Sequence, residues 1–385
     1  MSEPVVIVSA ARTPMGGFQG ALGTVSAPEL GGAAIAAALA RAGVESGAVD
    51  ELLMGCVLPA GQGQAPARQA GFAAGLPKEV PATTLNKMCG SGMKAVMLAH
   101  DTLRAGAGRL LVAGGMESMT NAPYLLPKMR GGARLGHAEA KDHMFLDGLE
   151  DAYDRGRLMG SFAEECATEF QFTRAAQDAY ALASLSRALA AQASGAFGAE
   201  IAPVADVGED EQPGRARPEK IPALKPAFRK DGTVTAANSS SISDGAAALV
   251  LMREADARAE GLPVRARVLG HASHAQEPAR FPTAPVPAAR KLMQRLGWDV
   301  GDVDLWEVNE AFAVVPMAFM AETGAPHDRM NVHGGACALG HPIGASGARI
   351  LVTLLHALER HDKATGIAAI CIGGGEGTAV ALERV

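Results

Sequence analysis

Short apolar runs alternate with helical patterns at both ends of this chain, and this alternation restricts the fold more than any other feature. A strand that is followed by a helix and then by another strand is typical of a parallel βαβ unit, so an α/β fold is expected. In the first part, the expected strands are 4–10, 51–57, 82–86 and 109–117, and the expected helices are 30–42, 66–74 and one that begins close to Gly90.

The last third of the chain repeats this design. Its expected strands are 264–269, 305–308 and 367–372, and its expected helices are 288–296, 316–322 and 350–359. Ala345-Ser346-Gly347 opens a helix that precedes a strand and a glycine turn, much as Gly90-Ser91-Gly92 does earlier. A duplicated half of about 120 residues is the simplest explanation.

The segment from Ser118 to about Ser243 interrupts the alternation. It is rich in Pro, Gly and charged residues, and its one clear helical pattern covers 173–194. Because a structureless loop of this length is rare in a compact domain, the segment is expected to form a lid or substrate-binding subdomain. The chain then re-enters the core through a strand at 246–252.

Cys89 lies where an extended segment turns into an apolar helix. The unpaired N–H groups at the start of this helix point back toward the sulfur and favour a thiolate. The helix end supplies only roughly 0.3–1 kcal/mol, so a thiol with an ordinary pKa near 8.5 stays mostly protonated at neutral pH. A nucleophilic role therefore needs a base from elsewhere, and the alternative is an inert core cysteine.

Three further residues could supply such chemistry. His341 follows Gly340 and precedes Pro342 in a Gly-rich loop, and an imidazole is the natural base for a thiol. Asn309 follows a strand end and is either a site residue or a helix N-cap. Cys371 ends a strand against Gly373, Gly374 and Gly375, whose N–H groups could receive an oxyanion.

Composition excludes several other classes of function. A formal net charge of -6 over 385 residues, without a basic cluster, argues against nucleic acid or an anionic membrane as a partner. No apolar run approaches the roughly 18–20 residues needed to span a bilayer, and no signal or transit peptide is recognised. The five cysteines form no CxxC pair, so reduced thiols and a cytoplasmic location are expected.

These motifs together resemble the thiolase family, and within it the acetoacetyl-CoA thiolases (acetyl-CoA C-acetyltransferases). The likeness covers essentially the whole chain, and it rests on Cys89-Gly90-Ser91, Asn309-Glu310-Ala311-Phe312, Gly340-His341-Pro342 and Cys371-Ile372-Gly373. It implies a reversible condensation of two acetyl-CoA molecules to acetoacetyl-CoA and CoA.

The resemblance also implies a fold and an assembly. Two duplicated, mixed five-stranded βαβαβαββ halves would form a five-layered αβαβα arrangement with an inserted loop domain. The corresponding divisions are 1–118 with 244–263 for the N-terminal half, 119–243 for the loop domain that binds CoA and mediates tetramerisation, and 264–385 for the C-terminal half. A homotetramer, built as a dimer of dimers, is expected.

The roles of the site residues follow from the same resemblance. Cys89 would carry the acetyl group after activation by His341, and Cys371 would remove the α-proton of the second acetyl-CoA. One oxyanion site would use His341 with a water held by Asn309. The other would use the N–H groups of Cys89 and Gly373.

The resemblance further implies which residues contact the substrate. Ser240 matches the serine that contacts pantetheine, and Met159 and Phe312 are further residues expected to bind the substrate or its CoA part. Phe281 with Pro282 replaces a Met-Gly pair and is similar to thiolases that accept 2-methyl-branched substrates. Coenzyme A is substrate and product, with no other cofactor required. A K⁺ ion is a further candidate ligand, at Tyr180, Ala236, Ala237 and Ser239.

Three alternatives stay open at this point. A 3-ketoacyl-CoA thiolase of fatty-acid β-oxidation would differ in pocket size rather than in catalytic residues. A decarboxylating ketosynthase would use His or Asn as its second base, and Cys371 argues against it. A non-catalytic thiolase-like lipid carrier need not keep both sulfurs. For the CoA phosphates, Lys225, Arg229 and Lys230 are candidates that could equally form a solvated basic loop.

Overall fold

The computed structural model describes residues 3–385. Its strands are β1 (Val5–Arg12), β2 (Gly16–Gly17), β3 (Glu51–Gly55), β4 (Ala82–Leu85), β5 (Leu110–Ser118), β6 (Tyr124–Leu125), β7 (Lys141–Asp142), β8 (Ser243–Arg253), β9 (Ala266–Ala275), β10 (Leu305–Val308), β11 (Thr365–Ile372) and β12 (Glu376–Arg384). Its α-helices are α1 (Ala27–Ala42), α2 (Pro66–Ala73), α3 (Ser91–Arg104), α4 (Met159–Glu169), α5 (Arg174–Ala193), α6 (Glu211–Arg215), α7 (Glu254–Ala259), α8 (Pro285–Leu296), α9 (Val314–Thr323), α10 (Ala336–Leu339) and α11 (Ile343–Arg360).

The main sheet has the strand order β10-β11-β12-β9-β1-β8-β5-β3-β4, with β2 paired to β8. The order divides into two runs with one plan. In β4-β3-β5-β8-β1, β3 pairs in parallel with β4 and β5, whereas β8 pairs antiparallel with β5 and β1. In β10-β11-β12-β9, β10 and β11 are parallel, and the two remaining pairings are antiparallel. The counterpart of β4 in the second run is reduced to a parallel bridge between Trp306 and Met330. The expected duplication is therefore confirmed.

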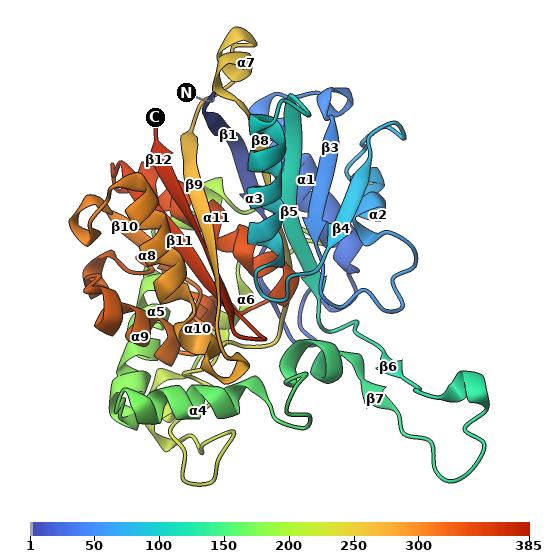
Figure 1. Cartoon of the computed structure of the whole chain (residues 1–385), viewed down its shortest axis with the longest axis vertical. Helices are drawn as coiled ribbons and strands as arrows, with labels where there is room; N and C mark the ends of the chain where they lie inside the picture. Colours follow the sequence, from blue (N-terminus) through green and yellow to red (C-terminus); the bar gives the residue numbers. More distant parts are fainter. Residues whose placement is uncertain (1–2) are drawn as a thin grey trace.

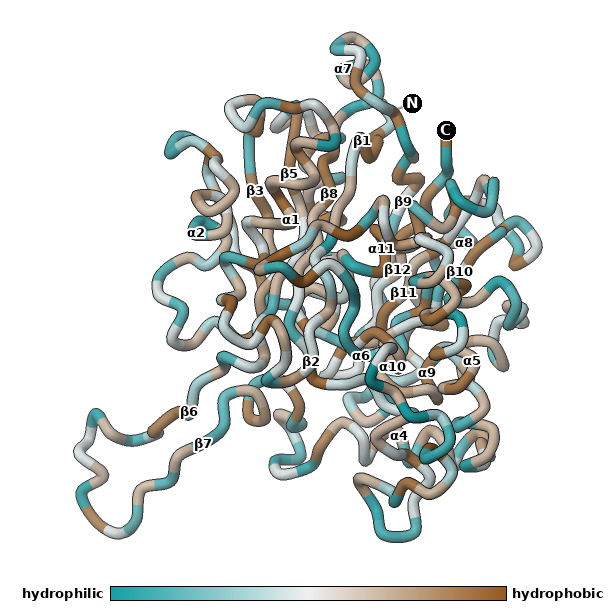
Figure 2. Tube along the Cα trace, turned by 180° about the vertical axis from the view of Figure 1, so that it is seen from behind, coloured by the Kyte–Doolittle hydropathy of each residue, from teal (hydrophilic) through white to brown (hydrophobic). Residues whose placement is uncertain are grey.

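Helices α3 and α11 lie between the two runs of strands and form the middle layer (Figure 1). One apolar core joins the inner sides of both runs of strands to these helices, through residues such as Val96, Leu351 and Ile370. A second core packs α1 and α2 on the outer side of the first half, and a third packs α8 and α9 on the second. This gives the expected five-layered αβαβα arrangement, and hydrophobic residues concentrate on its central strands (Figure 2).

Local signals explain why helices begin where they do. Helix α1 begins at Ala27, earlier than the apolar pattern predicts, because Ser26 and Glu29 form a capping box. Helix α3 begins at Ser91 with Gly90 as its N-cap, as expected. Strand β12 follows β11, which contains Cys371, although the sequence pattern predicts no further strand there.

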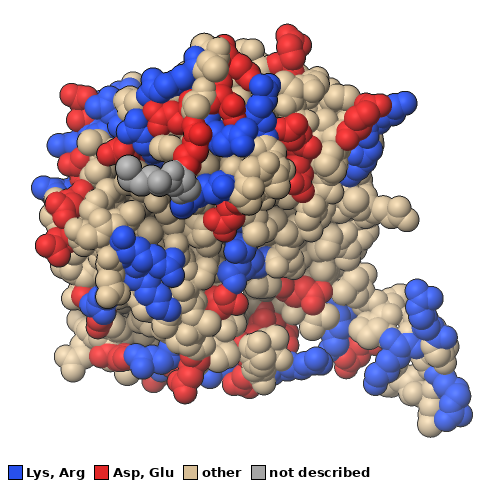
Figure 3. Space-filling model, turned by 45° about the horizontal axis from the view of Figure 1, so that its top comes forward, with Lys and Arg blue, Asp and Glu red and all other residues tan. Residues whose placement is uncertain are grey.

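The inserted segment contains more structure than its sequence suggests. Besides α5 it forms α4 and α6, where the sequence indicates only one helix. Strands β6 and β7 pair and carry an arm that projects from the body (Figure 1). Lys and Arg side chains gather on this arm (Figure 3). Within residues 3–385, no helix combines the length and apolar character needed to cross a membrane.

Candidate active site

A cavity of about 380 Å³ opens where the two halves and the inserted segment meet. Its wall is mostly apolar, and its polar groups come from a few positions. The lining residues are Cys89, Phe145, Gly148, Leu149, Leu158, Met159, Gly160, Ala227, Phe228, Ala236, Ser239, Ser240, Ser241, Ile242, Phe281, Ala311, Phe312, His341, Ile343 and Gly373. A concave apolar site with few convergent polar groups is the usual form of a ligand pocket.

Cys89 is held at the cavity by a tight turn between β4 and α3. The hydroxyl of Ser91 accepts from the N–H of Lys87 at 2.8 Å and donates to the carbonyl of Met88 at 2.6 Å. The cysteine is half-buried. Burial raises the pKa of its thiol to about 11, although the N–H groups of Gly373 and of Cys89 itself act in the opposite direction. The resting group is therefore the thiol, and nucleophilic attack requires a base.

His341 offers that base in a defined tautomer. Its Nδ1 lies 2.5 Å from the hydroxyl of Ser346, and that hydroxyl donates to the carbonyl of Pro342 at 2.9 Å. Nδ1 must therefore carry the hydrogen, and Nε2 keeps its lone pair. Nε2 is buried without a hydrogen-bond partner. Burial, followed by the charge of Arg349, lowers the pKa of His341 to about 3, so the ring is neutral.

Cys371 lies behind Cys89 on β11 and is buried. Burial, followed by the proximity of Cys89, raises the pKa of its thiol well above the ordinary value. The turn after β11 contributes the N–H of Gly373 to the Cys89 sulfur. An ion pair between Lys87 and Glu376 ties the turn that carries Cys89 to the start of β12. The two sulfurs are thus held together from opposite halves of the chain.

Asn309 follows β10 and is fully buried. Its backbone N–H donates to the carbonyl of Ala369 at 3.0 Å, whereas neither polar atom of its side chain has a protein partner. Buried amides are seldom left without partners, so this one is available to a water or a ligand. The sequence alternative of a helix N-cap does not hold, because the N-cap of α9 is Ala313.

The next residue, Glu310, anchors this segment. Its carboxylate accepts from Tyr180 at 2.9 Å, Ser184 at 2.7 Å and Asn331 at 2.8 Å. It also accepts from the N–H of Cys337 at 3.0 Å. Glu310 thereby joins α5 of the inserted segment to the loop before His341, a connection that spacing in the sequence does not reveal.

Backbone contacts without intervening side chains bring Cys89 and His341 together. A Cβ at Gly115 of β5 would lie 2.1 Å from the carbonyl oxygen of Gly344, in the first turn of α11. A Cβ at Gly92 of α3 would lie 2.8 Å from the nitrogen of Ala348. Glycine permits such close approach. The starts of α3 and α11 can therefore lie against each other, with both candidate catalytic groups at one end.

A buried carboxylate ties the same region together. Glu117, at the end of β5, accepts from the N–H groups of Val57, Leu58 and Gly344 at 2.9, 3.1 and 2.9 Å. Burial raises its pKa to about 7, although these hydrogen bonds act in the opposite direction. Spacing along the chain does not indicate this connection between the two halves.

Most of the residues expected to contact substrate line the cavity. Ser240 does so, and its hydroxyl and N–H both donate to the carbonyl of Ala311 at 3.0 Å. Met159, Phe281 and Phe312 form part of the wall. Pro282 does not, because it faces a separate groove beside Cys166 and Arg280. The wall also includes Leu149, Phe228 and Ile343, which sequence patterns did not single out.

The residues suggested for K⁺ do not share one surface. Ser239 lines the cavity and Ala237 lines an adjacent groove of about 320 Å³, whereas Ala236 lines both. The Tyr180 hydroxyl donates to Glu310, and the Ser239 hydroxyl donates to the carbonyl of Thr235 at 2.7 Å. The candidate phosphate contacts Lys225, Arg229 and Lys230 line neither space.

Comparison with known proteins shows which family has this arrangement of residues. Family models for the thiolase N-terminal and C-terminal domains match residues 5–255 and 262–384. The acetyl-CoA acetyltransferase of Pseudomonas aeruginosa is 50% identical over 392 residues, covering 99% of this chain and 100% of the relative, and that of Escherichia coli is 50% identical with 99% of both covered.

Solved structures agree with these sequence relatives. The Acat5 thiolase of Ascaris suum, in complex with coenzyme A, superposes with a TM-score of 0.96 at 43% identity and covers 100% of both chains. The acetyl-CoA acetyltransferase of Bacillus anthracis gives a TM-score of 0.96 at 40% identity over 100% of this chain and 99% of its own. The chain belongs to the thiolase family.

Proposed function

We propose that the protein is an acetyl-CoA C-acetyltransferase, which joins two acetyl-CoA molecules to acetoacetyl-CoA and CoA and also catalyses the reverse thiolysis. The observation that carries the proposal is that Cys89 and a neutral His341 line one cavity between the halves, with the buried thiol of Cys371 next to Cys89. One thiol can hold an acyl group while the other exchanges a proton with the second substrate. Full-length relatives at about half identity with this name support the choice of substrate.

In the first half-reaction, Nε2 of His341 takes the proton of the Cys89 thiol. The thiolate attacks the thioester carbonyl of acetyl-CoA, and the resulting oxyanion collapses to acetyl-Cys89. The departing CoA sulfur leaves with the proton of the Cys371 thiol, so Cys371 becomes a thiolate while His341 keeps the proton of Cys89. Because the thiol pKa is about 11 and the imidazole pKa about 3, the resting pair is neutral, and the proton moves to the imidazole as the sulfur attacks.

In the second half-reaction, the thiolate form of Cys371 removes an α-proton from a second acetyl-CoA. His341 and a water held by the unpartnered amide of Asn309 stabilise the enolate oxygen. The enolate carbon attacks the acetyl carbonyl, whose oxygen accepts from the N–H groups of Cys89 and Gly373. The tetrahedral adduct collapses to acetoacetyl-CoA, and Cys89 departs as a thiolate that takes back the proton held by His341, so both cysteines are thiols again.

The decisive experiment compares CoA-dependent thiolysis of acetoacetyl-CoA, 2-methylacetoacetyl-CoA and 3-ketooctanoyl-CoA by the wild type and Cys89→Ser. We expect cleavage of the two short substrates only, and loss of activity in the variant. Equal or faster cleavage of the eight-carbon substrate would assign the protein to β-oxidation. Activity that survives in Cys89→Ser would contradict the role of this cysteine.

We also propose that Phe281 sets tolerance for an α-methyl group. Its ring packs edge-on against Phe162 and Phe312, with centroids 6.3 and 6.5 Å away, and forms part of the cavity wall. Phe281→Met should lower the rate with 2-methylacetoacetyl-CoA relative to acetoacetyl-CoA. Pro282→Gly is the matched control, since Pro282 faces the other groove. An unchanged substrate ratio in Phe281→Met would refute the assignment.

Four further proposals concern assembly, location, ligands and the domain division. A homotetramer is supported by the projecting β6–β7 arm, on which Tyr124, Leu126 and Leu135 are exposed, and light scattering would test it. A cytoplasmic location is consistent with five free cysteines. K⁺ binding near Ala236 and Ser239 would be contradicted by equal activity in K⁺ and Na⁺ buffers. The domain division at 118, 243 and 263 is proposed as well, and limited proteolysis at these points would test it.

A further inference from the structure

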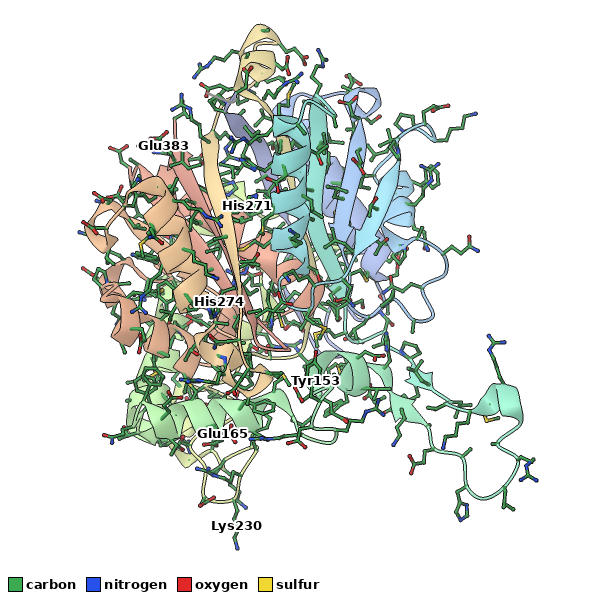
Figure 4. All side chains as sticks on the ribbon, in the orientation of Figure 1. Tyr153, Glu165, Lys230, His271, His274 and Glu383 are labelled. Atoms are coloured by element: carbon green, nitrogen blue, oxygen red, sulfur yellow. The ribbon has the colours of Figure 1, made fainter. Side chains whose placement is uncertain are left out.

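A group of potential metal ligands lies outside the cavity, at the junction of the two halves. His100 and Asp101 belong to α3, and His271 lies on β9 of the other half (Figure 4). Each offers one ligand atom, and the three atoms lie within 4.8 Å of one another. Among residues 3–385, no other group of three His, Cys, Asp or Glu residues meets this criterion.

The geometry of the group is close to that of a tetrahedral ion site. Oδ1 of Asp101 lies 3.1 Å from Nδ1 of His100 and 2.9 Å from Nε2 of His271. Ligand atoms at about 2.1 Å from a tetrahedral ion are separated by roughly 3.4 Å. The two histidine nitrogens lie within 4.8 Å of each other, so they need to approach by at most about 1.4 Å. The two rings stand edge to face at 85°, with centroids 5.2 Å apart, and direct their nitrogens toward the same carboxylate.

Burial distinguishes this group from a chance surface cluster. The side chains of His100 and His271 are only 4% and 17% exposed, whereas Asp101 is 53% exposed. The imidazoles are thus held in place by the fold, and the carboxylate leaves an open side through which an ion can enter. The backbone at His271 is further fixed because Arg295 donates to its carbonyl at 3.0 Å.

We propose that His100, Asp101 and His271 bind a divalent transition-metal ion of the zinc class. Two imidazoles with one carboxylate suit such ions, and a water would complete a four-coordinate site. On binding, Nδ1 of His100 and Nε2 of His271 become lone-pair donors, and each ring keeps its hydrogen on the other nitrogen. The ion would tie α3 to β9 and so link the two halves. Arg104, which lies close to His100, would weaken the binding of a cation.

The test titrates the EDTA-treated full chain with ZnCl₂ by calorimetry and repeats the titration with CoCl₂ by absorption spectroscopy. We expect one site per chain, a Co²⁺ spectrum without thiolate charge transfer, and an affinity at least tenfold lower in His271→Gln and in Asp101→Asn. The matched control is His274→Gln. His274 lies on the same strand but contacts Lys291 and Gln276, so its replacement should leave the affinity within twofold.

Thermal unfolding gives an independent readout. Zinc should raise the Tm of the wild type and of His274→Gln by about 2 °C or more at 100 µM, and leave that of His271→Gln unchanged. Three results would overturn the proposal: no binding at 100 µM, a thiolate band that places the ion on cysteine, or full affinity in His271→Gln. Because none of these readouts depends on acyl transfer, they are independent of the proposed enzyme activity.

Discussion

Replacing Gly115 by Ala tests directly whether close backbone contact sets the active site. Strand β5 lies against the first turn of α11, and a Cβ at this position would sit 2.1 Å from the Gly344 oxygen and 3.0 Å from Cα of Ala345. Cβ atoms essentially never approach another heavy atom within 3.0 Å, and both neighbours are backbone atoms. The start of α11 must therefore move by about 1 Å.

The size of the effect follows from what this turn carries. His341 immediately precedes α11, and Ser346, which holds its ring, lies in the first turn. A misplacement of about 1 Å can cost about 100-fold in rate. Overpacking a close-packed core costs about 1–3 kcal/mol. We expect Gly115→Ala to lower kcat/KM for acetoacetyl-CoA thiolysis about 100-fold and to reduce the free energy of unfolding by about 1–3 kcal/mol.

The control for this experiment is Gly47→Ala. Gly47 is exposed, its Cβ would meet no atom within 4 Å, and it lies in a short turn far along the chain from the site residues. Steady-state thiolysis and urea unfolding of both variants give the comparison. If Gly115→Ala matched Gly47→Ala in both measurements, the close contact would not position the site.

Three further outcomes are expected. Asn309→Ala should lower kcat about 100-fold with an unchanged urea midpoint, because its side chain has no protein partner, and a large loss of stability would contradict this. Ser346→Ala should lower kcat at least about tenfold, because His341 loses the partner that fixes its tautomer; an effect confined to KM would count against that reason. Burial lowers the pKa of His333 to about 4. The unfolded chain therefore binds this proton at a higher pH than the folded chain, so His333 alone should lower the free energy of unfolding by about 3 kcal/mol between pH 6.5 and 4, and a pH dependence unaltered in His333→Asn would refute the assignment.

Features with a local cause could be predicted from the sequence. The position of Cys89 before α3 was predictable because Gly90 and the apolar spacing of Met93, Val96 and Met97 mark the helix start. Strand β10 matches its expected bounds of 305–308. Helix α4 is not predicted because its N-cap, Leu158, supplies no side-chain cap that would mark its start.

Features that depend on tertiary structure could not be predicted. Phe281 and Pro282 are neighbours in sequence, but the tight turn at 278–283 directs them to different cavities. The tie between Glu117 and Gly344, and the contribution of Phe228 to the wall, join residues from distant parts of the chain. Periodicity describes one element at a time, so it carries no information about such pairs.

The pairing of β1 with β9 has a consequence for how substrate can enter. Val5, Val6 and Ile7 pair with Val268, Arg267 and Ala266, so the two halves share one hydrogen-bonded sheet rather than meeting across a free interface. A hinge motion that moved the two halves apart would break these hydrogen bonds and separate α3 from α11. Substrate is therefore expected to reach the cavity without separation of the halves, along the wall to which the inserted segment contributes Leu158, Met159 and Phe228, so the two sulfurs keep their spacing.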